Sequence, residues 1–575
     1  MIILGIHPGY HEASVCLFDD YQLISAVALE RLTRLKIDGG RVPVEAINEC
    51  LSIANIRKTD VEVIVLGRGI FPWKYFTHFR GTRLIEGHAR QIFGKQKNKS
   101  MERELIRYKL QESESIFNKK RFLGDFGFSK DVDLYFFNHH LAHALPTLFH
   151  TEWESSLLFT ADGGGDNIQY SHRVFKDEKL LTLYGDDSEI LKPMRVDSLG
   201  LAYGFATQSL GFSINRHEGK LTGLAALGKP SAKYEISKHF SINRNGQILS
   251  DFEDNASMKN FIYAVSKNLS REDMASSIQA VLEDKIIGSI QLLVKNNNVR
   301  NLGLAGGVFG NVRLNQRLVE EAGVEEIFIY PAMSDQGLPS GGVLQFLLNR
   351  DGLKKWLKQR WKLDNLYLGK DYGSIIDKTL SKNPKFQTIE GVPHQNAAKL
   401  IHNGKIVAIY TKGMEYGPRA LGARSILASP TDPKINQTLN DRLSRSEFMP
   451  FAPVISEENA DKVFDIDKSN RYTSKFMTIT CNVKKPWRER IPAVVHVDGT
   501  ARPQIINRSI NPLYYDILKS YYEFSGIPTI INTSFNAHEE PIINSPEECA
   551  EALSEGRVDA VVTNNGFYQL QKNSD

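Results

Sequence analysis

Two stretches of the chain repeat one pattern of apolar residues, and this repeat constrains the fold more than any other feature. In each copy, three short alternating segments are separated by turns, which predicts three consecutive strands. The first copy comprises residues 2–7, 13–18 and 22–29. The second copy comprises residues 156–161, 169–175 and 179–185. We therefore predict a duplicated lobe in which each copy opens with a three-strand meander.

The predicted fold class is α/β. A repeated strand–turn–strand–strand unit followed by helices is typical of actin-like and sugar-kinase-like ATPases, whose nucleotide lies in a cleft between two similar lobes. We predict that residues 1–360 form this duplicated-lobe domain, with a basic and aromatic insert at about 71–125. The charged segment 353–365 is predicted to be a helix and a linker, and residues 365–575 to form a second domain.

Composition narrows the class of protein. A chain of 575 residues is too long for one hydrophobic core, and its net charge of +4 does not by itself indicate nucleic acid. Its four cysteines lie far apart without a Cys-x-x-Cys pair, so a reducing compartment fits best. The first residues read as a strand, and no apolar run reaches the roughly 18 residues of a membrane span. We expect a cytoplasmic enzyme with no membrane partner.

The segment Asn138-His-His-Leu-Ala-His-Ala144 predicts a metal site. His139 and His143 are four apart, so they project from one face of a helix and can share an ion. A carboxylate must complete the set, and Asp162 or Asp335 can supply it from strand ends. Two histidines and a carboxylate with open positions suit Fe(II) or a similar divalent ion. The alternative is a pair of partly buried structural histidines.

Glycine-rich segments predict phosphate contacts. The buried strand 156–161 runs into Asp162 and a triple-glycine turn, whose free N–H groups can approach phosphate. A second such loop, residues 306–311, opens a helix, and a third segment, 340–342, starts another. Lys220 either reaches a phosphate or lies in a solvated loop.

His11 and two arginines are further candidates. His11 lies in the first turn, where it is either a general base aimed into the cleft or a turn histidine bonded to backbone. Arg419 and Arg424 surround a Leu-Gly turn, and arginine forks grip phosphate or carboxyphosphate oxygens bidentately. Surface ion pairing is the alternative for both arginines.

The insert carries basic residues interleaved with aromatic ones. Residues 71–110 hold ten Lys or Arg against three Glu. The interleaved aromatic residues are Phe71, Trp73, Tyr75, Phe76 and Phe79. This combination is compatible with binding RNA or an acidic substrate. We favour a helical segment with a solvated basic face over nucleic-acid binding.

Together these motifs resemble the O-carbamoyltransferases of the NodU/CmcH type, which act on nodulation factors, cephems and aminoglycosides. The similar pieces in the first part are His139–Ala144, Ala161–Gly163, Glu218–Ala225 and Ala305–Asn311. Those in the second part are Tyr416–Ile426, Met449–Pro453, His496–Arg502 and Asn532–Asn536. They occur in family order and span nearly the whole chain.

The resemblance implies a two-step reaction. A C-terminal YrdC-like domain would join carbamoyl phosphate to ATP, giving carbamoyladenylate, with Mg²⁺ accompanying ATP. The N-terminal actin-like metallo-domain would then pass the carbamoyl group to a hydroxyl of a small-molecule acceptor, a sugar or natural product. Because carbamoyladenylate reacts with water, transfer is expected to occur through a closed cavity.

The resemblance also assigns residues. His11 would deprotonate the acceptor hydroxyl. The iron ligands would be His139, His143 and Asp335, with Asp162 as ligand or phosphate partner. The nucleotide would be held by Gly306, Gly307, Asn311, Gly341 and Gly342. Gly163 and Gly164 of the triple-glycine turn and Lys220 are added to this set from the local pattern of the sequence. Carbamoyl phosphate would be held by Arg419, Arg424, Arg502 and Ser534.

The chain departs from the family pattern at two places. Many relatives have Asp after the first-turn histidine, where this chain has Glu12. The family commonly shows Lys and Arg flanking the segment before Pro-Phe-Ala-Pro, where this chain has Leu443 and Met449. Either Arg442 and Arg445 supply the missing charge, or carbamoyl phosphate is held differently.

Three other functions compete with this one. The first is a tRNA-modifying carbamoyl or threonylcarbamoyl transferase, which the basic insert and the shared metallo-fold favour. The second is a hydrogenase-maturation carbamoyltransferase, whose acylphosphatase domain and paired Cys-x-x-Cys motifs this chain lacks. The third is a nucleotide-binding scaffold without catalysis. We expect a small-molecule hydroxyl acceptor rather than nucleic acid.

Overall fold

The computed structural model describes residues 1–77, 98–193, 195–445 and 450–571, and its N-terminal part contains two sheets of one design. The first sheet has the strand order β3 (Gln22–Ala28), β2 (Ser14–Asp19), β1 (Ile2–His7), β4 (Val63–Gly67) and β7 (Asp133–Phe137). The second has the order β10 (Lys179–Tyr184), β9 (Ile168–Lys176), β8 (Ser156–Gly165), β13 (Asn301–Ala305) and β14 (Glu326–Ile329). In both sheets the first three strands are antiparallel and the last two run parallel to the first strand of the copy. The predicted duplication of a mixed α/β unit is confirmed.

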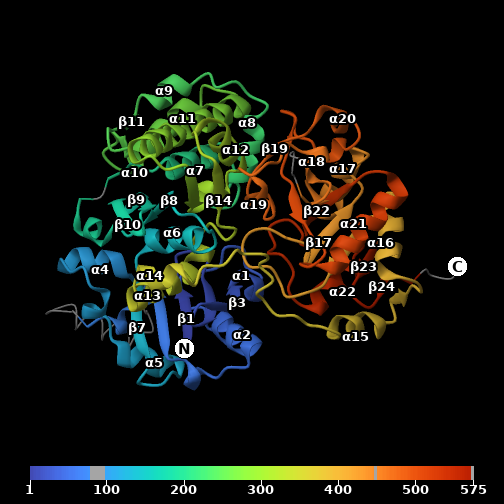
Figure 1. Cartoon of the computed structure of the whole chain (residues 1–575), viewed down its shortest axis with the longest axis horizontal. Helices are drawn as coiled ribbons and strands as arrows, with labels where there is room; N and C mark the ends of the chain where they lie inside the picture. Colours follow the sequence, from blue (N-terminus) through green and yellow to red (C-terminus); the bar gives the residue numbers. More distant parts are fainter. Residues whose placement is uncertain (78–97, 194, 446–449, 572–575) are drawn as a thin grey trace.

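The last strand of each sheet leads to a helix, and these two helices pack against each other between the sheets (Figure 1). They are α6 (His139–Phe149) after β7 and α13 (Leu338–Asp351) after β14. A Cβ atom on Gly341 would lie 1.7 Å from the carbonyl oxygen of Ala142, and one on Gly342 would lie 2.3 Å from the Phe137 ring. Glycine is required here because the two helices approach so closely.

The expected nucleotide role of Gly341 and Gly342 is therefore wrong. Both residues are buried in α13, against α6 and the end of β7, where a phosphate has no access. Glycines at a helix start have the same sequence signature whether a ligand or a neighbouring helix approaches them.

The insert belongs to the core of the first lobe. Its described strands and α-helices are β5 (Ile70–Pro72), β6 (Asn98–Ser100), α4 (Met101–Tyr108) and α5 (Lys119–Phe126). Phe71, Tyr75 and Phe76 are buried, and the Phe71 ring meets the Phe117 ring at 5.1 Å between centroids. These rings fill the core and are not available for stacking on bases. Phe79 lies outside the described residues.

The second lobe is covered by helices that border the site. They include α7 (Leu199–Ser209), α8 (Glu218–Ala225), α11 (Arg271–Asn297) and α12 (Val312–Glu321). No helix in the described parts of the chain combines the length and the apolar character needed to cross a bilayer.

The segment between the two halves is mostly extended. Helix α14 (Leu353–Leu357) ends earlier than the predicted helix over 353–365, because Leu363 and Leu366 are buried and hold the following chain in an extended path. The third sheet has the order β15-β24-β23-β16-β17-β22-β18-β21. Its strands are β15 (Phe386–Thr388), β16 (Val407–Tyr410), β17 (Arg424–Ala428), β18 (Ala452–Ser456), β21 (Gln504–Ile506), β22 (Thr529–Ser534), β23 (Ala560–Val562) and β24 (Phe567–Leu570). Helices α16 (Pro393–His402) and α21 (Pro512–Ser525) pack together beside it (Figure 1).

Replacing Gly341 tests the crossing of α6 and α13. Gly341→Ala places a methyl group against the Ala142 carbonyl, so we expect the free energy of unfolding to fall by about 1–3 kcal/mol. Gly124→Ala is the matched control, because Gly124 lies within α5 with no atom within 4 Å of the added Cβ. It should be neutral or stabilising by about 0.5–1 kcal/mol. Urea denaturation measures both changes, and equal effects would contradict the close crossing.

Candidate active site

The start of α6 presents two histidines side by side. Asn138 caps the helix by accepting a hydrogen bond from the Leu141 N–H, and Asp166 accepts one from the His139 N–H at 2.7 Å. One helical turn separates His139 from His143, and their rings lie 4.7 Å apart between centroids. The predicted helix and the shared face are both confirmed.

Two carboxylates from the second lobe meet these histidines. Asp162 lies in β8, and Asp335 opens the short helix η6 (Asp335–Gly337) after β14. Asp162 Oδ2 lies 3.1 Å from His143 Nε2, and Asp335 Oδ1 lies 3.4 Å from the same atom. One donor atom from each of the four side chains lies within 4.8 Å of the others. The structure therefore brings together all four residues of the predicted metal set.

The electrostatics of this cluster reflect burial and opposite charge. Burial alone would lower the pKa of His139, but the charges of Asp335 and Asp162 outweigh it and raise this pKa to about 9. Burial alone would raise the carboxyl pKa of Asp162 and Asp335, but the histidines hold both below their usual range.

The donor set fits a divalent cation. His139 Nε2 and Asp335 Oδ1 are buried and have no hydrogen-bond partner among the described residues. Buried polar atoms without partners are rare and call for a ligand or an ion. Two imidazoles and two carboxylates are the nitrogen and oxygen donors that first-row divalent metals accept.

The glycine segment beside the cluster folds differently from the prediction. Strand β8 continues through Gly165, and the turn is made by Asp166 and Asn167, with φ values of 50° and 68°. Asp and Asn tolerate the positive φ that a two-residue hairpin turn requires. Gly163 and Gly164 thus lie in the partly exposed end of a strand rather than in a turn. A Cβ on Gly165 would fall 2.3 Å from the His139 ring. Glycine is therefore required at position 165 because the strand passes so close to a histidine of the metal cluster.

The second glycine loop also contacts the cluster. The Gly307 N–H points to Asp162 Oδ2 at 3.4 Å. Gly306 has φ 101°, and a Cβ on it would lie 2.1 Å from the Ala161 carbonyl oxygen. Asn311 caps α12 and exchanges hydrogen bonds with Gln279. The side chain of Asn311 is therefore occupied by the fold, which does not support its expected contact with nucleotide.

His11 lies at the edge of the cluster. Its Nδ1 is 3.5 Å from Glu12 Oε2, and Glu12 in turn accepts a hydrogen bond from the Ser334 hydroxyl at 2.9 Å. Burial would lower the pKa of His11, but Glu12 and the charges of Asp335 and Asp162 raise it to about 9. The structure thus places His11 within electrostatic reach of Asp335 and Asp162, two of the four donors.

A cavity of about 300 Å³ lies between the two domains. Six cationic side chains line it: Lys36, Arg216, Lys220, Arg419, Arg445 and Arg502. Glu539 is the one carboxylate among the described residues of its lining, and Ser534 adds a hydroxyl. Arg419 Nε is buried without a hydrogen-bond partner in the described structure, and burial lowers the pKa of this arginine to about 10. Such a cavity favours an anion with several oxygens.

The loop that carries Arg419 is held by a buried carboxylate. Glu415 Oε1 accepts hydrogen bonds from the N–H groups of Leu421, Ala423 and Arg424 at 2.9, 2.7 and 3.1 Å. Three donors to one carboxylate fold residues 416–423 into a fixed turn. Arg419 is presented to the cavity from this turn.

Two predicted phosphate ligands lie elsewhere. Arg424 is fully buried, donates from Nη1 to the Thr411 carbonyl at 2.7 Å, and stacks 3.6 Å from the Tyr410 ring centroid. Arg442 pairs with Asp559 at 3.0 Å. The expectation is wrong for Arg424, whose guanidinium is enclosed by the fold of the second domain. Arg442 is partly exposed and is not among the described residues that line the cavity. Arg445 does line the cavity, but its guanidinium donates to Thr533 Oγ1 at 2.9 Å and to the Asn536 carbonyl at 2.7 Å. Met449 lies outside the described residues.

A second group of donors lies at the rim of this cavity, formed by His217, His538 and Glu539. His217 Nδ1 accepts a hydrogen bond from the Ser213 N–H at 3.1 Å, so the neutral ring carries its proton on Nε2. That Nε2–H donates to Glu539 Oε1 at 2.6 Å. This geometry makes the group a hydrogen-bonded contact between the domains rather than a metal site.

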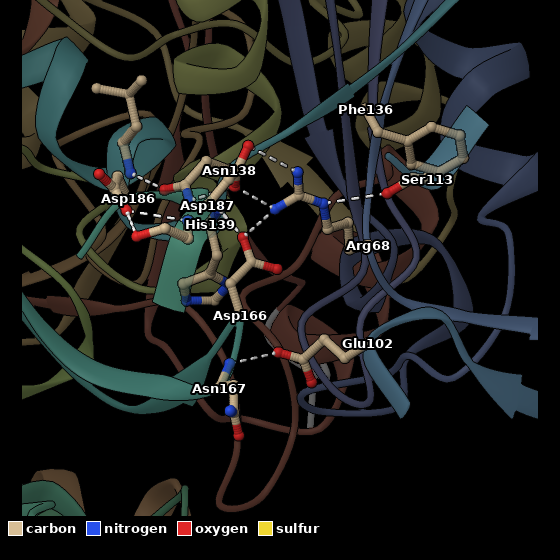
Figure 2. Close-up of polar contacts among 12 residues, drawn as sticks. Arg68, Glu102, Ser113, Phe136, Asn138, His139, Asp166, Asn167, Asp186 and Asp187 are labelled. Atoms are coloured by element: carbon tan, nitrogen blue, oxygen red, sulfur yellow. Dashed lines mark hydrogen bonds and ion pairs between the residues drawn. The ribbon is translucent and has the colours of Figure 1, made fainter. Parts of the chain in front are cut away.

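A partly buried ion-pair network holds the start of α6 (Figure 2). Arg68 Nη1 lies 2.8 Å from Asp166 Oδ2, the oxygen that accepts the His139 N–H. The same nitrogen lies 2.7 Å from Asp187 Oδ1, which also accepts a hydrogen bond from the Asn138 amide. The sequence offered no sign of this network, because its members are far apart along the chain.

Removing Arg68 tests this network. Arg68→Met leaves the carboxylate of Asp166, which is 2% exposed, without its cation, so we expect a loss of about 3–5 kcal/mol in the free energy of unfolding. The matched control is Arg57→Met, whose surface pair with Asp60 should leave the Tm unchanged. Differential scanning calorimetry measures both variants. An unchanged Tm in Arg68→Met would show that the network does not hold the helix.

Both halves of the chain match known families of proteins. The family description Carbamoyltransferase N-terminus matches residues 2–344, and Carbamoyltransferase C-terminus matches residues 398–569. An uncharacterised protein of Methanocaldococcus jannaschii is 31% identical over 97% of this chain and 98% of its own length. Nodulation protein NolNO of Sinorhizobium fredii is 28% identical over 98% of this chain and 79% of its own length.

Among solved structures, full-length HypF in its phosphate- and nucleotide-bound form is 12% identical over 61% of this chain and 56% of that chain, with a TM-score of 0.32. A TM-score this low supports no statement about function. The family matches cover most of the sequence and include both halves that carry the site. The chain belongs to the carbamoyltransferase family, of the NodU/CmcH type, and is an O-carbamoyltransferase.

Proposed function

We propose that the protein makes carbamoyladenylate from carbamoyl phosphate and ATP and then transfers the carbamoyl group to a hydroxyl of a small molecule. The observation that carries this proposal is the cationic cavity between the domains, which lies beside a separate cluster of metal donors. Two anionic co-substrates need a site of high positive charge, and the transfer step needs a second site. In this proposal the N-terminal domain is actin-like and the C-terminal domain YrdC-like.

The first step takes place in the cavity. Water cleaves carbamoyl phosphate to carbamate and phosphate, and a carbamate oxygen then attacks the α-phosphorus of ATP. A P–O bond to the β-phosphate breaks, and pyrophosphate leaves with its electron pair. Arg419 and Arg502 hold phosphate oxygens, and Lys220 and Ser534 complete the contacts, with Arg445 donating to the Ser534 hydroxyl and orienting it. Mg²⁺ accompanies ATP as its usual counterion.

An adjoining cavity suits the nucleoside. Its volume is about 250 Å³, and it is lined from the first domain by α8, α11 and α12, including Ala226, Ala280 and Val312. Both cavities share His496 and Thr222 in their linings. An apolar pocket beside a cationic one is the arrangement that a nucleotide requires, with the base in the first and the phosphates in the second.

The second step belongs to the cluster of donors. His139, His143 and Asp335 would hold a divalent metal, Fe(II) or a similar ion, and Asp162 lies in reach as ligand or phosphate partner. When bound, this cation would polarise the phosphate oxygens of the leaving AMP and offset the charges of the two carboxylates. The bound cation would offset the charges of Asp335 and Asp162 that raise the pKa of His11, and this favours the neutral ring. In that form His11 Nε2 accepts the proton of the acceptor hydroxyl, while Glu12 orients the ring through Nδ1.

The transfer step needs no reactant besides carbamoyladenylate and the acceptor. The acceptor oxygen bonds to the carbamoyl carbon, the bond from that carbon to the phosphate oxygen breaks, and AMP leaves with the electron pair. The proton lost by the hydroxyl resides on His11 Nε2. The acceptor is proposed to be a sugar or natural product, as the resemblance to the NodU/CmcH type implies. Burial of Phe71, Tyr75 and Phe76 removes three rings that could otherwise stack on the bases of an RNA acceptor.

Variants at the two sites should separate the two steps. Arg502→Ala should reduce the exchange of labelled pyrophosphate into ATP, measured with carbamoyl phosphate present, by at least about 100-fold, because a charged contact to the reacting phosphates is lost. His139→Ala should leave this exchange within about threefold of wild type, because its side chain lies in the other site. Arg508→Ala, which removes a surface pair with Asp516, is the control and should change nothing. Loss of exchange in His139→Ala would contradict two separate sites, and a wild type without exchange would remove the proposed reaction.

Metal binding should depend on pH. In the metal-free protein the pKa of His139 is raised to about 9, so at pH 7 a proton occupies the nitrogen that the metal needs. Raising the pH removes this competitor, so the association constant for Co²⁺ should rise about tenfold per pH unit between pH 7 and 8 and level off above about 9. Isothermal titration calorimetry in buffers of different ionisation enthalpy measures the released proton. An association constant independent of pH would show that His139 is not a ligand.

A further inference from the structure

His7 is a buried histidine that the proposed chemistry does not use. It is the last residue of β1 and is 5% exposed. Neither of its ring nitrogens has a hydrogen-bond partner among the described residues. Burying an imidazole without hydrogen-bond partners costs free energy, so we expect this histidine to have a specific role.

The two oxygens of Asp335 face different histidines. Oδ1 lies 3.4 Å from His143 Nε2 and 3.7 Å from His139 Nε2. Oδ2 lies 3.5 Å from His7 Nε2. Asp335 therefore stands between the proposed metal position on one side and His7 on the other.

Two glycines leave room for the His7 ring. A Cβ on Gly9 would lie 2.2 Å from His7 Nε2, and a Cβ on Gly67 would lie 2.9 Å from Nδ1. The ring thus fits into a slot bounded by backbone, which limits its orientation. A fixed ring with one nitrogen toward a carboxylate is suited to orienting that carboxylate.

We infer that His7 is a positioning residue, whose Nε2–H donates to Oδ2 of Asp335 and directs Oδ1 toward the metal. The inference rests on the proposed metal centre and adds a residue to it. Hydrogen bonds from outside the ligand sphere commonly change metal affinity by about 10- to 100-fold. Because β1 belongs to the first lobe and Asp335 to the second, this contact also ties the lobes together at the site.

Co²⁺ titration of the full-length protein tests the inference. His7→Leu removes the donor at similar size, and we expect its dissociation constant for Co²⁺ to rise about 10- to 100-fold. His7→Gln keeps an N–H donor and should recover most of that loss. His172→Leu is the matched control, because His172 is also buried with both ring nitrogens unpartnered but lies in β9. It should bind Co²⁺ as the wild type does.

A second readout separates positioning from a general loss of structure. The pyrophosphate exchange of the other site should stay within about threefold of wild type in both His7 variants. The inference is overturned if His7→Leu binds Co²⁺ like the wild type, if His7→Gln binds as poorly as His7→Leu, or if exchange falls together with affinity. If the wild type itself binds no Co²⁺, the proposed metal centre fails and this inference fails with it. Wild-type binding with no effect of His7→Leu refutes only the inference.

Discussion

The close crossing of α6 and α13 is the contact on which the site depends. The first helix carries His139 and His143, and the second follows directly after Asp335 and η6. Because Gly341 lets α13 approach the Ala142 backbone, residues from two copies of one folding unit meet at a single point. Neither lobe holds a complete set of donors by itself, so the duplication creates the site rather than merely enlarging the protein.

Positive and negative side chains lie in two different sites. Lysine and arginine side chains from both domains line one cavity, whereas histidine and aspartate side chains form the adjacent cluster. Phosphate-bearing co-substrates are attracted to the first, and a cation is attracted to the second. The Tyr416 hydroxyl donates to the backbone carbonyl of Gln336, so the loop that carries Arg419 is hydrogen-bonded to the residue that follows Asp335. In the proposed reaction a reactive intermediate is made at one site and used at the other. Sites that are held close together by the backbone shorten the time in which water can destroy that intermediate.

Local patterns in the sequence predicted much of the fold and of the metal site. The features that the sequence did not predict depend on contacts between residues far apart along the chain. The repeated meanders and the spacing of His139 and His143 are local, and the structure confirms them. Gly341 and Arg424 were wrongly predicted to be ligand contacts, because a glycine between helices and a buried arginine have the same sequence signature as those of a phosphate loop. His7 could not be singled out, since its meaning comes from Asp335, far away along the chain.

The most direct test of this account is anomalous diffraction from crystals of the protein grown with Co²⁺, recorded at the cobalt absorption edge. The account predicts one strong peak about 2.0–2.2 Å from the Nε2 atoms of His139 and His143, with Asp335 Oδ1 as a further ligand. No peak at these atoms under saturating Co²⁺, or a peak at His217 and His538 in its place, would contradict the central claim that the two lobes join to hold the metal.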